Sequence, residues 1–352
     1  MPGDLILITG ATGHLGFRVL RYALEYDYNV RAVVRSKAKA EAVRTNPVLK
    51  AMDKASQLSF TVVPDFLAPG AFDEAVKGVR YIIHVASPLP TRVGEGADFE
   101  KVLIEPAVRG TIGLYEAAQR AGTVERIVVT SSTLAIQPLS AFIPPGIDAT
   151  IGPDSRLPEM PGPYPTPFAA YAASKIAAFN RSEAWVKETS PAFSVVNIHP
   201  SFIFGRDDMC FNTEDFLANG TNSFLLKPAI STAGSLGPLV NNFNNVNDAA
   251  RVHVLALNPE KVKGSQSYIV SSAGDDAYLY NKVNEIVARR FPEAVKDGRL
   301  PNGGKYDTLV AKVDNSKTEG TFGKLTGLEE TVVSVVGHWL ELLEKEKAGA
   351  RN

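Results

Sequence analysis

The sequence predicts a doubly wound α/β fold, in which helices cover both faces of a parallel sheet, with a smaller and mostly C-terminal lobe. Short apolar runs alternate with helical stretches as far as Pro200, which is the pattern of parallel strands joined by helices. After Pro200 the alternation loosens, and residues 206–245 are rich in Asn and Gly. We therefore expect one domain from residues 1–200 plus about 241–258, and a second lobe from 201–240 plus 259–352.

The expected strands of the first domain are short runs of apolar residues, as in strands buried on both faces. They cover residues 5–9, 30–34, 58–63, 79–85, 127–130 and 193–199. Helices are expected at 14–26, from Ser36 onward, at 99–121 with Gly122 as the C-terminal stop, at 168–188, at 246–257 with Asn247 as the cap, and at 329–346. Residues 134–168 are rich in Pro and Gly and are expected to form a long loop.

Composition excludes several function classes. The chain has 352 residues, a net charge of -1 and a hydrophobic fraction of 45%, so no bulk charge attracts nucleic acid or an anionic membrane. The only cysteine, Cys210, cannot form an internal disulfide, which fits a reducing compartment. No signal peptide and no membrane-spanning run is visible. We expect a soluble cytoplasmic protein, a monomer or a homodimer, without a metal site.

A glycine turn joins the first expected strand to the first helix. Gly10 permits a tight turn, Gly13 allows the backbone to approach a pyrophosphate, and Gly16 allows close packing of the helix. The helix N-terminus then offers free N–H groups and the positive end of its dipole to phosphates. Three glycines could also simply form a turn, but this position after an apolar strand predicts a Rossmann-type dinucleotide site.

The end of the second strand indicates which dinucleotide is bound. Sites for NAD usually carry Asp or Glu there for the ribose 2′-hydroxyl, whereas residues 33–37 contain no acid. Arg35, with Lys39 one helical turn further on, instead offers cations to a 2′-phosphate. The alternative is a surface arginine at a strand end. We predict NADPH/NADP+ as the cofactor.

Tyr171 and Lys175 lie four residues apart on an expected helix and so share one face. A nearby ammonium is expected to lower the pKa of the phenol, which could then pass a proton to a carbonyl oxygen while hydride reaches the carbon. The same spacing recurs at Tyr278 and Lys282, but that copy lies beyond the alternating region and we reject it.

A serine pair, Ser131 and Ser132, follows the fifth strand, at the sheet edge where open α/β sheets hold their ligands. The hydroxyl of Ser132 could hydrogen-bond a substrate oxygen, although a serine there could equally be a helix cap.

Taken together, these motifs resemble the extended short-chain dehydrogenase/reductase family, in particular its dihydroflavonol-reductase-like branch of yeast and fungal aldehyde and ketone reductases. The matching stretches follow the family's order through most of the chain. They are 8–16, 64–66, 84–88, 105–111, 129–132, 171–175, 199–201 and 246–254. One departure is Gly113, where the family often has Asn.

The resemblance implies a role for individual residues. Tyr171 would donate the proton, Lys175 would also hold the nicotinamide ribose, and Ser132 would position the carbonyl. Arg35 would bind the 2′-phosphate and Asp65 the adenine. The residues implied to line the cofactor site are Gly10, Thr12, Gly13, His14, Leu15, Gly16, Arg35, Lys39, Asp65, Phe66, Val85, Ala86, Ser87, Lys175, Pro200 and Phe202.

The predicted function is therefore NADPH-dependent reduction of a small hydrophobic aldehyde or ketone. Aromatic and apolar residues in segments 88–98, 134–168 and 202–245 favour such a substrate, although many of them could be ordinary core. They are Pro88, Leu89, Leu134, Phe142, Tyr164, Phe168, Phe202, Phe204, Phe211 and Phe224. Two alternatives stay open. One is a nucleotide-sugar epimerase or dehydratase that retains NAD, and the other is a non-catalytic NADP-sensing protein.

Overall fold

A computed structural model describes residues 2–90, 93–94, 96–232, 234–272 and 279–349. Its chain divides into two compact units. The first comprises Met1–Gln137, Pro153–His199 and Ala250–Tyr268. The second comprises Pro138–Gly152, Pro200–Ala249 and Ile269–Asn352.

This division differs from the predicted boundaries in four segments. Residues 138–152, Pro200 and residues 241–249 belong to the second unit, and residues 259–268 belong to the first. The first segment is tied to the second unit by a β-bridge between Ile151 and Val313. The last segment leads into an edge strand of the central sheet, which the sequence reading had not recognised.

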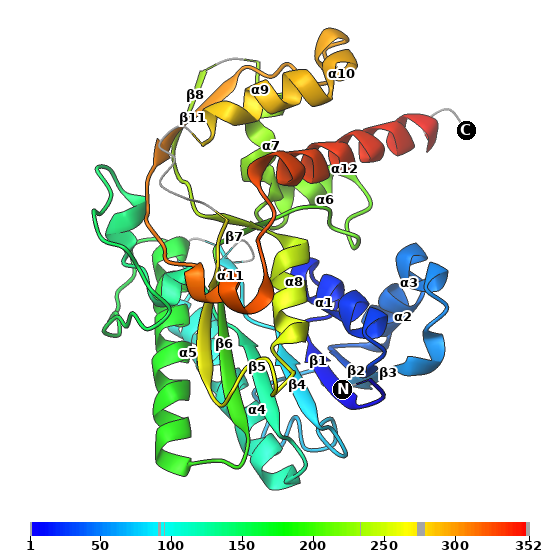
Figure 1. The fold of residues 1–352 in the computed structure, drawn as a ribbon, viewed down its shortest axis with the longest axis vertical. Coiled ribbons are helices and arrows are strands. Elements are labelled where there is room, and N and C mark those ends of the chain that lie inside the picture. The colour runs from blue at the N-terminus through cyan, green and yellow to red at the C-terminus, as the bar shows by residue number, and fades with distance from the viewer. Residues whose placement is uncertain (1, 91–92, 95, 233, 273–278, 350–352) are drawn as a thin grey trace. The chain divides into compact units, whose positions relative to one another are not determined.

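Within the described residues, seven strands form one sheet in the order β10-β6-β5-β4-β1-β2-β3 (Figure 1). The strands are β1 (Leu5–Thr9), β2 (Asn29–Val34), β3 (Leu58–Val62), β4 (Tyr81–His84), β5 (Arg126–Thr130), β6 (Ser194–Pro200) and β10 (Gln266–Val270). All neighbouring pairs from β3 to β6 are parallel. The order reverses beside β1, which pairs with β2 and with β4, so the carboxyl ends of β1 and β4 flank a topological switch point.

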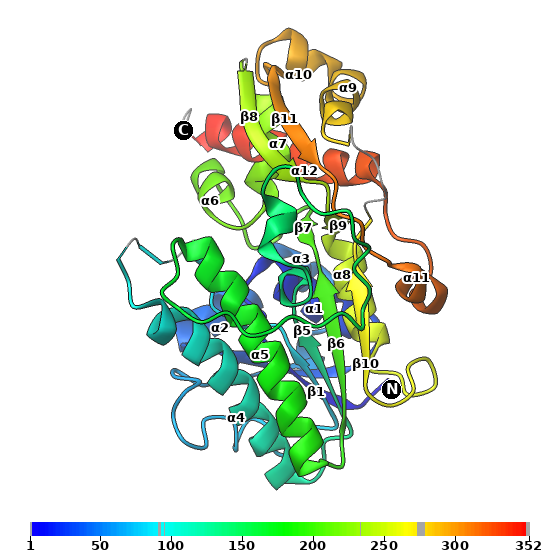
Figure 2. The same ribbon diagram turned by 90° about the vertical axis from the view of Figure 1, so that its left-hand side faces the viewer.

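Helices cover both faces of this sheet, as the continuous apolar strands predict. Helices α4 (Glu105–Ala121) and α5 (Pro167–Thr189) lie side by side on one face, and α1 (His14–Glu25) and α8 (Val246–Leu255) lie on the other (Figure 2). Buried Leu114 and Tyr115 of α4 pack in one core cluster with Leu7, Ile82 and Ile127 from the strands.

The ends of these helices follow the expected chemistry with two corrections. Ser36 caps α2 (Lys37–Arg44) by accepting a hydrogen bond from the Lys39 nitrogen, and Gly122 ends α4 at a φ of 68°. The helix predicted from residue 99 instead begins with a π-helical turn, Glu100–Ile104. Asn247 is not a cap, because α8 starts at Val246 and the side chain of Asn245 accepts from the Asn247 nitrogen.

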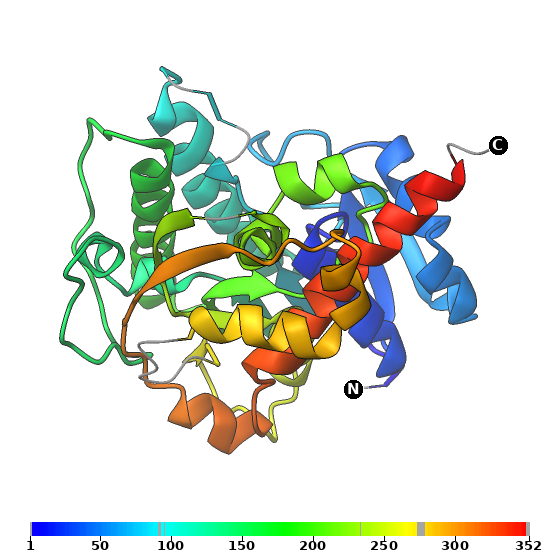
Figure 3. The same ribbon diagram turned by 90° about the horizontal axis from the view of Figure 1, so that it is seen from above.

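Among its described residues, the second unit contains two short parallel ribbons, the 3₁₀ helix Leu139–Phe142 and six α-helices. The ribbons pair β7 (Phe202–Phe204) with β9 (Phe243–Asn245), and β8 (Gly234–Val240) with β11 (Gly304–Leu309). The helices are α6 (Thr213–Ala218), α7 (Asn222–Ile230), α9 (Asn281–Arg290), α10 (Pro292–Lys296), α11 (Ser316–Phe322) and α12 (Leu328–Gly349). Helix α9 packs beside α12, and both enclose a core that contains Val283, Val335 and Trp339 (Figure 3).

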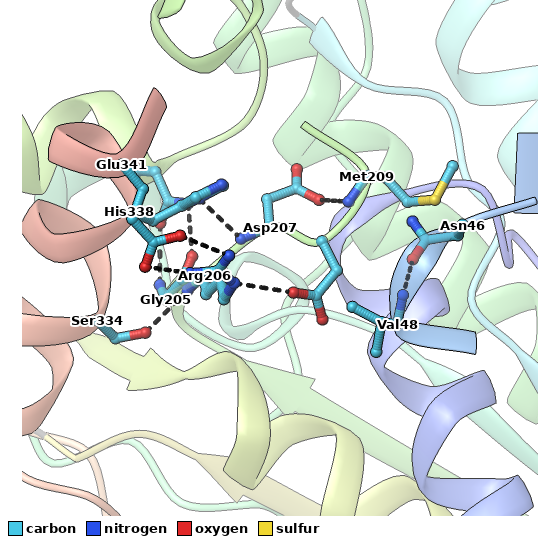
Figure 4. A network of polar contacts seen from close by, with 11 residues as sticks. Asn46, Val48, Gly205, Arg206, Asp207, Met209, Ser334, His338 and Glu341 are labelled. Carbon is cyan, nitrogen blue, oxygen red and sulfur yellow. Dashed lines mark hydrogen bonds and ion pairs between the residues drawn. The ribbon is translucent and has the colours of Figure 1, made fainter. Parts of the chain in front are cut away.

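Polar contacts fasten α12 to the segment after β7 (Figure 4). The guanidinium of Arg206 pairs with Glu341 at 2.8 Å and with Asp208 at 3.1 Å, and its backbone nitrogen donates to the Ser334 hydroxyl at 2.9 Å. Because Arg206 and Glu341 are partly exposed, these pairs mainly fix the geometry of the segment.

The asparagine-rich segment 241–247 has a structural explanation within the second unit. Asn241 accepts from the Ala311 nitrogen at 3.0 Å, and Asn244 donates to the Ser201 carbonyl oxygen at 3.1 Å. These side chains are buried, so each amide satisfies a backbone group that water cannot reach.

In the described part of the chain, no helix combines the length and the apolar character that crossing a membrane requires.

Candidate active site

In the glycine turn between β1 and α1, the backbone packs closely against the backbone of neighbouring segments. Gly10 has a φ of +79°, and a Cβ atom there would lie 2.8 Å from the Ala86 nitrogen. A Cβ on Gly16 would lie 2.0 Å from the Gly10 carbonyl oxygen, so Gly16 lets α1 pack on the turn itself. Gly13 is exposed at the N-terminus of α1, where no side chain caps the helix. A phosphate can therefore approach these N–H groups closely.

The end of β4 forms a second wall beside this turn. The hydroxyl of Thr9 accepts from the Ala86 nitrogen at 3.2 Å and lies 2.8 Å from Nδ1 of His84. Burial and, to a smaller extent, the charge of Lys175 lower the pKa of His84 to about 4. The imidazole is therefore neutral at neutral pH, and the Thr9 hydroxyl is free to donate to its Nδ1 atom. This buried pair holds Val85 and Ala86 against the glycine turn.

The end of β2 presents an exposed cation beside an aromatic ring. The guanidinium of Arg35 lies 6.0 Å from the ring centroid of Phe66, and within the described residues no carboxylate pairs with it. Asp65 accepts a hydrogen bond from the Leu67 nitrogen at 2.8 Å, which is the role of a turn residue. Its second carboxylate oxygen is not engaged by that bond. The exposed side chain of Lys39 starts from the first turn of α2.

Tyr171 and Lys175 lie one turn apart on α5, as predicted. The Lys175 ammonium is 5.6 Å from the centroid of the Tyr171 ring and donates to the Ser87 hydroxyl at 3.1 Å. This bond ties α5 to the segment after β4, next to the Thr9–His84 pair. The amine and the phenol therefore lie near the carboxyl end of the parallel strands, where ligands bind in such sheets.

The expected electrostatics of this pair are corrected by the structure. Burial raises the pKa of the Tyr171 phenol to about 12, and burial lowers the pKa of Lys175 to about 8. The Lys175 ammonium thus does not bring the pKa of the phenol toward neutral pH in this structure, because the loss of hydration on burial sets the shift of both groups. Tyr171 is a protonated phenol at pH 7 and can act as a proton donor.

Ser132 begins the 3₁₀ turn η4 (Thr133–Ala135), which packs against α5. Its hydroxyl oxygen accepts from the Leu134 nitrogen at 3.2 Å, so the serine is a cap as well as a candidate for substrate binding. The hydroxyl proton is free to donate elsewhere. Its backbone carbonyl oxygen lies 3.2 Å from Nδ1 of His199, a residue for which the sequence predicts no role.

The remaining predicted residues fall into two groups. Thr12, His14 and Leu15 lie in or directly after the glycine turn of the first unit. Pro200 and Phe202 belong to the second unit, so their contact with a cofactor stays a prediction. Of the rejected second motif, Tyr278 lies outside the described residues and Lys282 lies on α9.

The aromatic residues expected around a substrate differ in exposure. Phe204 is fully buried in the core of the second unit, so the expectation that it lines a pocket is wrong. Phe202 packs against Phe224 with ring centroids 5.7 Å apart. Phe168 and Phe211 are exposed. The other members stay candidates for a substrate wall.

Gly113 lies on a face of α4 where an added Cβ would meet nothing within 4 Å. It lines a shallow hollow of about 190 Å³ with residues 66–72 and Arg109. No side chain is therefore needed at this position for packing.

Known proteins resemble the chain along its whole length. Residues 6–271 match the NAD dependent epimerase/dehydratase family. The chain is 42% identical to a ketoreductase of Cercospora nicotianae, over 99% of this chain and 98% of that protein. It is 26% identical to a putative NADPH-dependent methylglyoxal reductase of Candida albicans, over 94% and 98%. The crystal structure of yeast methylglyoxal/isovaleraldehyde reductase complexed with NADPH has the same fold, with a TM-score of 0.77, 24% identity and coverage of 97% and 99%.

Proposed function

Since this chain belongs to the NAD dependent epimerase/dehydratase family of extended short-chain dehydrogenases/reductases, we propose that it reduces a small apolar ketone or aldehyde with NADPH. The observation that carries the proposal is the Tyr171–Lys175 pair, held by a 3.1 Å hydrogen bond to Ser87 at the strand end beside the glycine turn. A phenol, an amine and a phosphate-binding turn at one sheet edge suit hydride transfer to a carbonyl.

The residues present fit NADPH. The cradle between Gly10 and Ala86 has no room for a Cβ atom, and the uncapped N-terminus of α1 suits the pyrophosphate. Arg35 has no acidic partner among the described side chains and could bind the 2′-phosphate, with Phe66 beside the adenine. The relatives named for NADPH support the same cofactor. When bound, the nicotinamide would supply the hydride.

Each catalytic side chain has a separate task in this reduction. The Ser132 hydroxyl donates a hydrogen bond to the substrate carbonyl oxygen and fixes its orientation. Tyr171, whose pKa is raised, is protonated at neutral pH and gives its proton to that oxygen as the carbonyl π bond breaks. The charge of Lys175 stabilises the phenolate left behind, and water restores the phenol. The product is an alcohol.

The proposal also covers the class of the substrate and the cellular location of the protein. The ketoreductase that is 42% identical to this chain supports a ketone, and exposed Leu89 and Phe168 are consistent with an apolar substrate. The cytoplasmic location and the monomeric or homodimeric state stay predictions.

The test measures NADPH oxidation with a panel of apolar ketones, aldehydes and diketones, with NADH as the control cofactor. Tyr171→Phe keeps the ring and removes the proton donor, so kcat should fall about 100-fold to 10,000-fold while NADPH binding persists. Tyr81→Phe is the matched control, because it removes a buried hydroxyl from the first residue of β4, at the opposite end of that strand. Full activity of the Tyr171→Phe variant would refute the proposed mechanism.

A further inference from the structure

Strand β6 carries a buried histidine behind the catalytic serine. His199 has no exposed surface, and its Nδ1 atom lies 3.2 Å from the Ser132 carbonyl oxygen. We propose that His199 is a positioning residue, whose Nδ1–H donates to this carbonyl and thereby fixes the direction of the Ser132 hydroxyl. The role of Ser132 in this statement rests on the proposed function.

The partner of Nδ1 determines the form of the ring. A carbonyl oxygen can only accept, so Nδ1 must carry the proton. Burial lowers the pKa of His199 to about 3, hence the ring is neutral at neutral pH and Nε2 has a bare lone pair. That Nε2 atom is buried and has no hydrogen-bond partner among the described residues. An apolar residue at position 199 would have no unsatisfied polar atom, so Nε2 gives histidine no advantage there. The hydrogen bond made by Nδ1 is what histidine offers and an apolar residue does not.

Helix α5 holds the ring in place from the other side. The ring of Phe179 meets the imidazole edge to face, with centroids 4.8 Å apart at 82°. The guanidinium of Arg156 lies 4.5 Å from the Phe179 ring centroid and forms two 2.7 Å bonds to Glu183. This stack leaves the imidazole little freedom to rotate away from Ser132.

The same helix carries the proton donor. Residues 171, 175, 179 and 183 follow one another at intervals of four on α5, so each is the neighbour of the next on the helix surface. One helix therefore orients the phenol directly and the serine through Phe179 and His199. The distance between the two groups that contact the substrate oxygen then depends on a single rigid element.

The backbone of Ser132 shows what the bond restrains. Ser132 is extended, with φ −163° and ψ 155°, and its carbonyl also accepts from the Ala135 nitrogen at 3.0 Å. The preceding residue is fixed by a 2.8 Å bond from the Ser131 nitrogen to the Ile198 carbonyl. The imidazole thus braces the last peptide before the turn, from the strand next to β5.

Three substitutions test the proposal in the full-length protein with NADPH and the best ketone of the panel. Asn places an amide nitrogen near the position of Nδ1, Gln places one near Nε2, and Leu has neither. We expect His199→Gln and His199→Leu to lower kcat about 10-fold to 100-fold, while the Kd for NADPH stays within about twofold. His199→Asn should retain most of kcat. Equal kcat in all three variants, or a better Gln than Asn variant, would overturn the proposal.

A second measurement separates this proposal from the proposed function. Nitrogen-15 NMR of histidine-labelled wild-type protein should show a neutral His199 with its proton on Nδ1, from pH 6 to 8. A proton on Nε2 overturns the positioning role even if the protein is an active reductase. The expected tautomer in a protein that reduces no carbonyl would instead reject the proposed function and leave the hydrogen bond established. This readout also decides the question if the Leu variant fails to fold.

Discussion

Two sets of buried polar side chains, one in each unit, serve different purposes. In the first unit His84, Lys175 and Tyr171 gather at one edge of the sheet, where burial lowers the pKa of His84 and Lys175 and raises that of Tyr171. In the second unit the buried amides of Asn241 and Asn244 hydrogen-bond to the backbone of neighbouring segments. Both sets are withdrawn from water, but only the first consists of groups whose proton affinity is changed by that withdrawal.

The difference teaches how to recognise a reactive edge. A buried amide that satisfies a backbone N–H or carbonyl stabilises the fold, because it replaces a bond that water would otherwise make. A buried amine with a lowered pKa costs stability at the pH values where it stays charged, and displaced pKa values are more typical of a functional site. Removing the buried amine of the first unit should therefore raise the stability of the protein, and removing a buried amide of the second unit should lower it.

The largest expected effect concerns cofactor choice at the first unit. Arg35→Ser removes the guanidinium available to a 2′-phosphate, so the Kd for NADPH should rise about 10-fold to 100-fold with little change for NADH. Arg44→Ser is a matched control, since Arg44 also lies over an aromatic ring, that of Phe60 at 5.2 Å. Titration of each variant with both cofactors checks this, and equal weakening of NADPH and NADH would contradict it.

Lys175→Met tests the stability cost of the buried amine. The pKa of Lys175 is lowered from 10.5 to about 8, so below pH 8 folding must bury the amine in its charged, protonated form. The variant should be inactive and yet more stable than wild type by roughly 1–3 kcal/mol at pH 7. Between about pH 8 and 10 the unfolded chain binds the proton more than the folded chain does, so wild-type stability rises and the gap narrows.

Denaturant unfolding of both proteins at pH 7, 8 and 9.5 measures this gap. Lys187→Met, at an exposed position of the same helix, is the control and should show no such pH dependence. A variant less stable than wild type at pH 7 would mean that the hydrogen bond to Ser87 outweighs the desolvation of the amine.

Asn241→Ala makes the opposite prediction for the second unit. The substitution leaves the Ala311 nitrogen buried without its 3.0 Å partner, so the free energy of unfolding should fall by about 1–3 kcal/mol. Asn219→Ala, at an exposed site of the same unit, should change it by less than about 0.5 kcal/mol. Unfolding curves of the wild-type protein and the two variants measure this difference. An unchanged free energy of unfolding in the Asn241→Ala variant would contradict the contrast between the two units.

The smallest effect distinguishes two glycines of the first unit. Gly113→Ala should raise the free energy of unfolding by up to about 1 kcal/mol, because the helix gains propensity and the new methyl meets nothing within 4 Å. Gly16→Ala should be destabilising and weaken NADPH binding, since its methyl would overlap the Gly10 carbonyl. Thermal unfolding with and without NADPH compares them, and a stabilising Gly16→Ala would show that the turn can shift.

Much of the first unit was predictable because its signals are local. A run such as Leu5–Thr9 must be buried on both faces, and Gly10 and Gly122 mark turns that need positive φ. Strand β10 was not predicted, because it is a short apolar run that follows an irregular loop. In the second unit, ribbons such as the one formed by β8 and β11 pair residues that are far apart in the sequence. The hydrophobic periodicity of a segment does not indicate which distant segment it pairs with.

For the candidate site, the sequence predicts a set of residues but not their electrostatic surroundings. The spacing of Tyr171 and Lys175 predicts a shared helix face, but the direction of the phenol pKa shift depends on how deeply both groups are buried. The hydrogen bond from His199 to Ser132 joins a residue of β6 to a residue just after the neighbouring strand β5, and it has no sequence signature beyond a histidine before Pro200.

The four-residue spacing on α5 also limits how this protein can change over evolutionary time. Inserting or deleting one residue between Tyr171 and Glu183 would rotate every later side chain by about 100° around the helix axis. A single such change would therefore disturb the relative orientation of the side chains at positions 171, 175, 179 and 183. Homologues that preserve the chemistry should therefore vary in the loops around α5 and keep its length constant between these two positions.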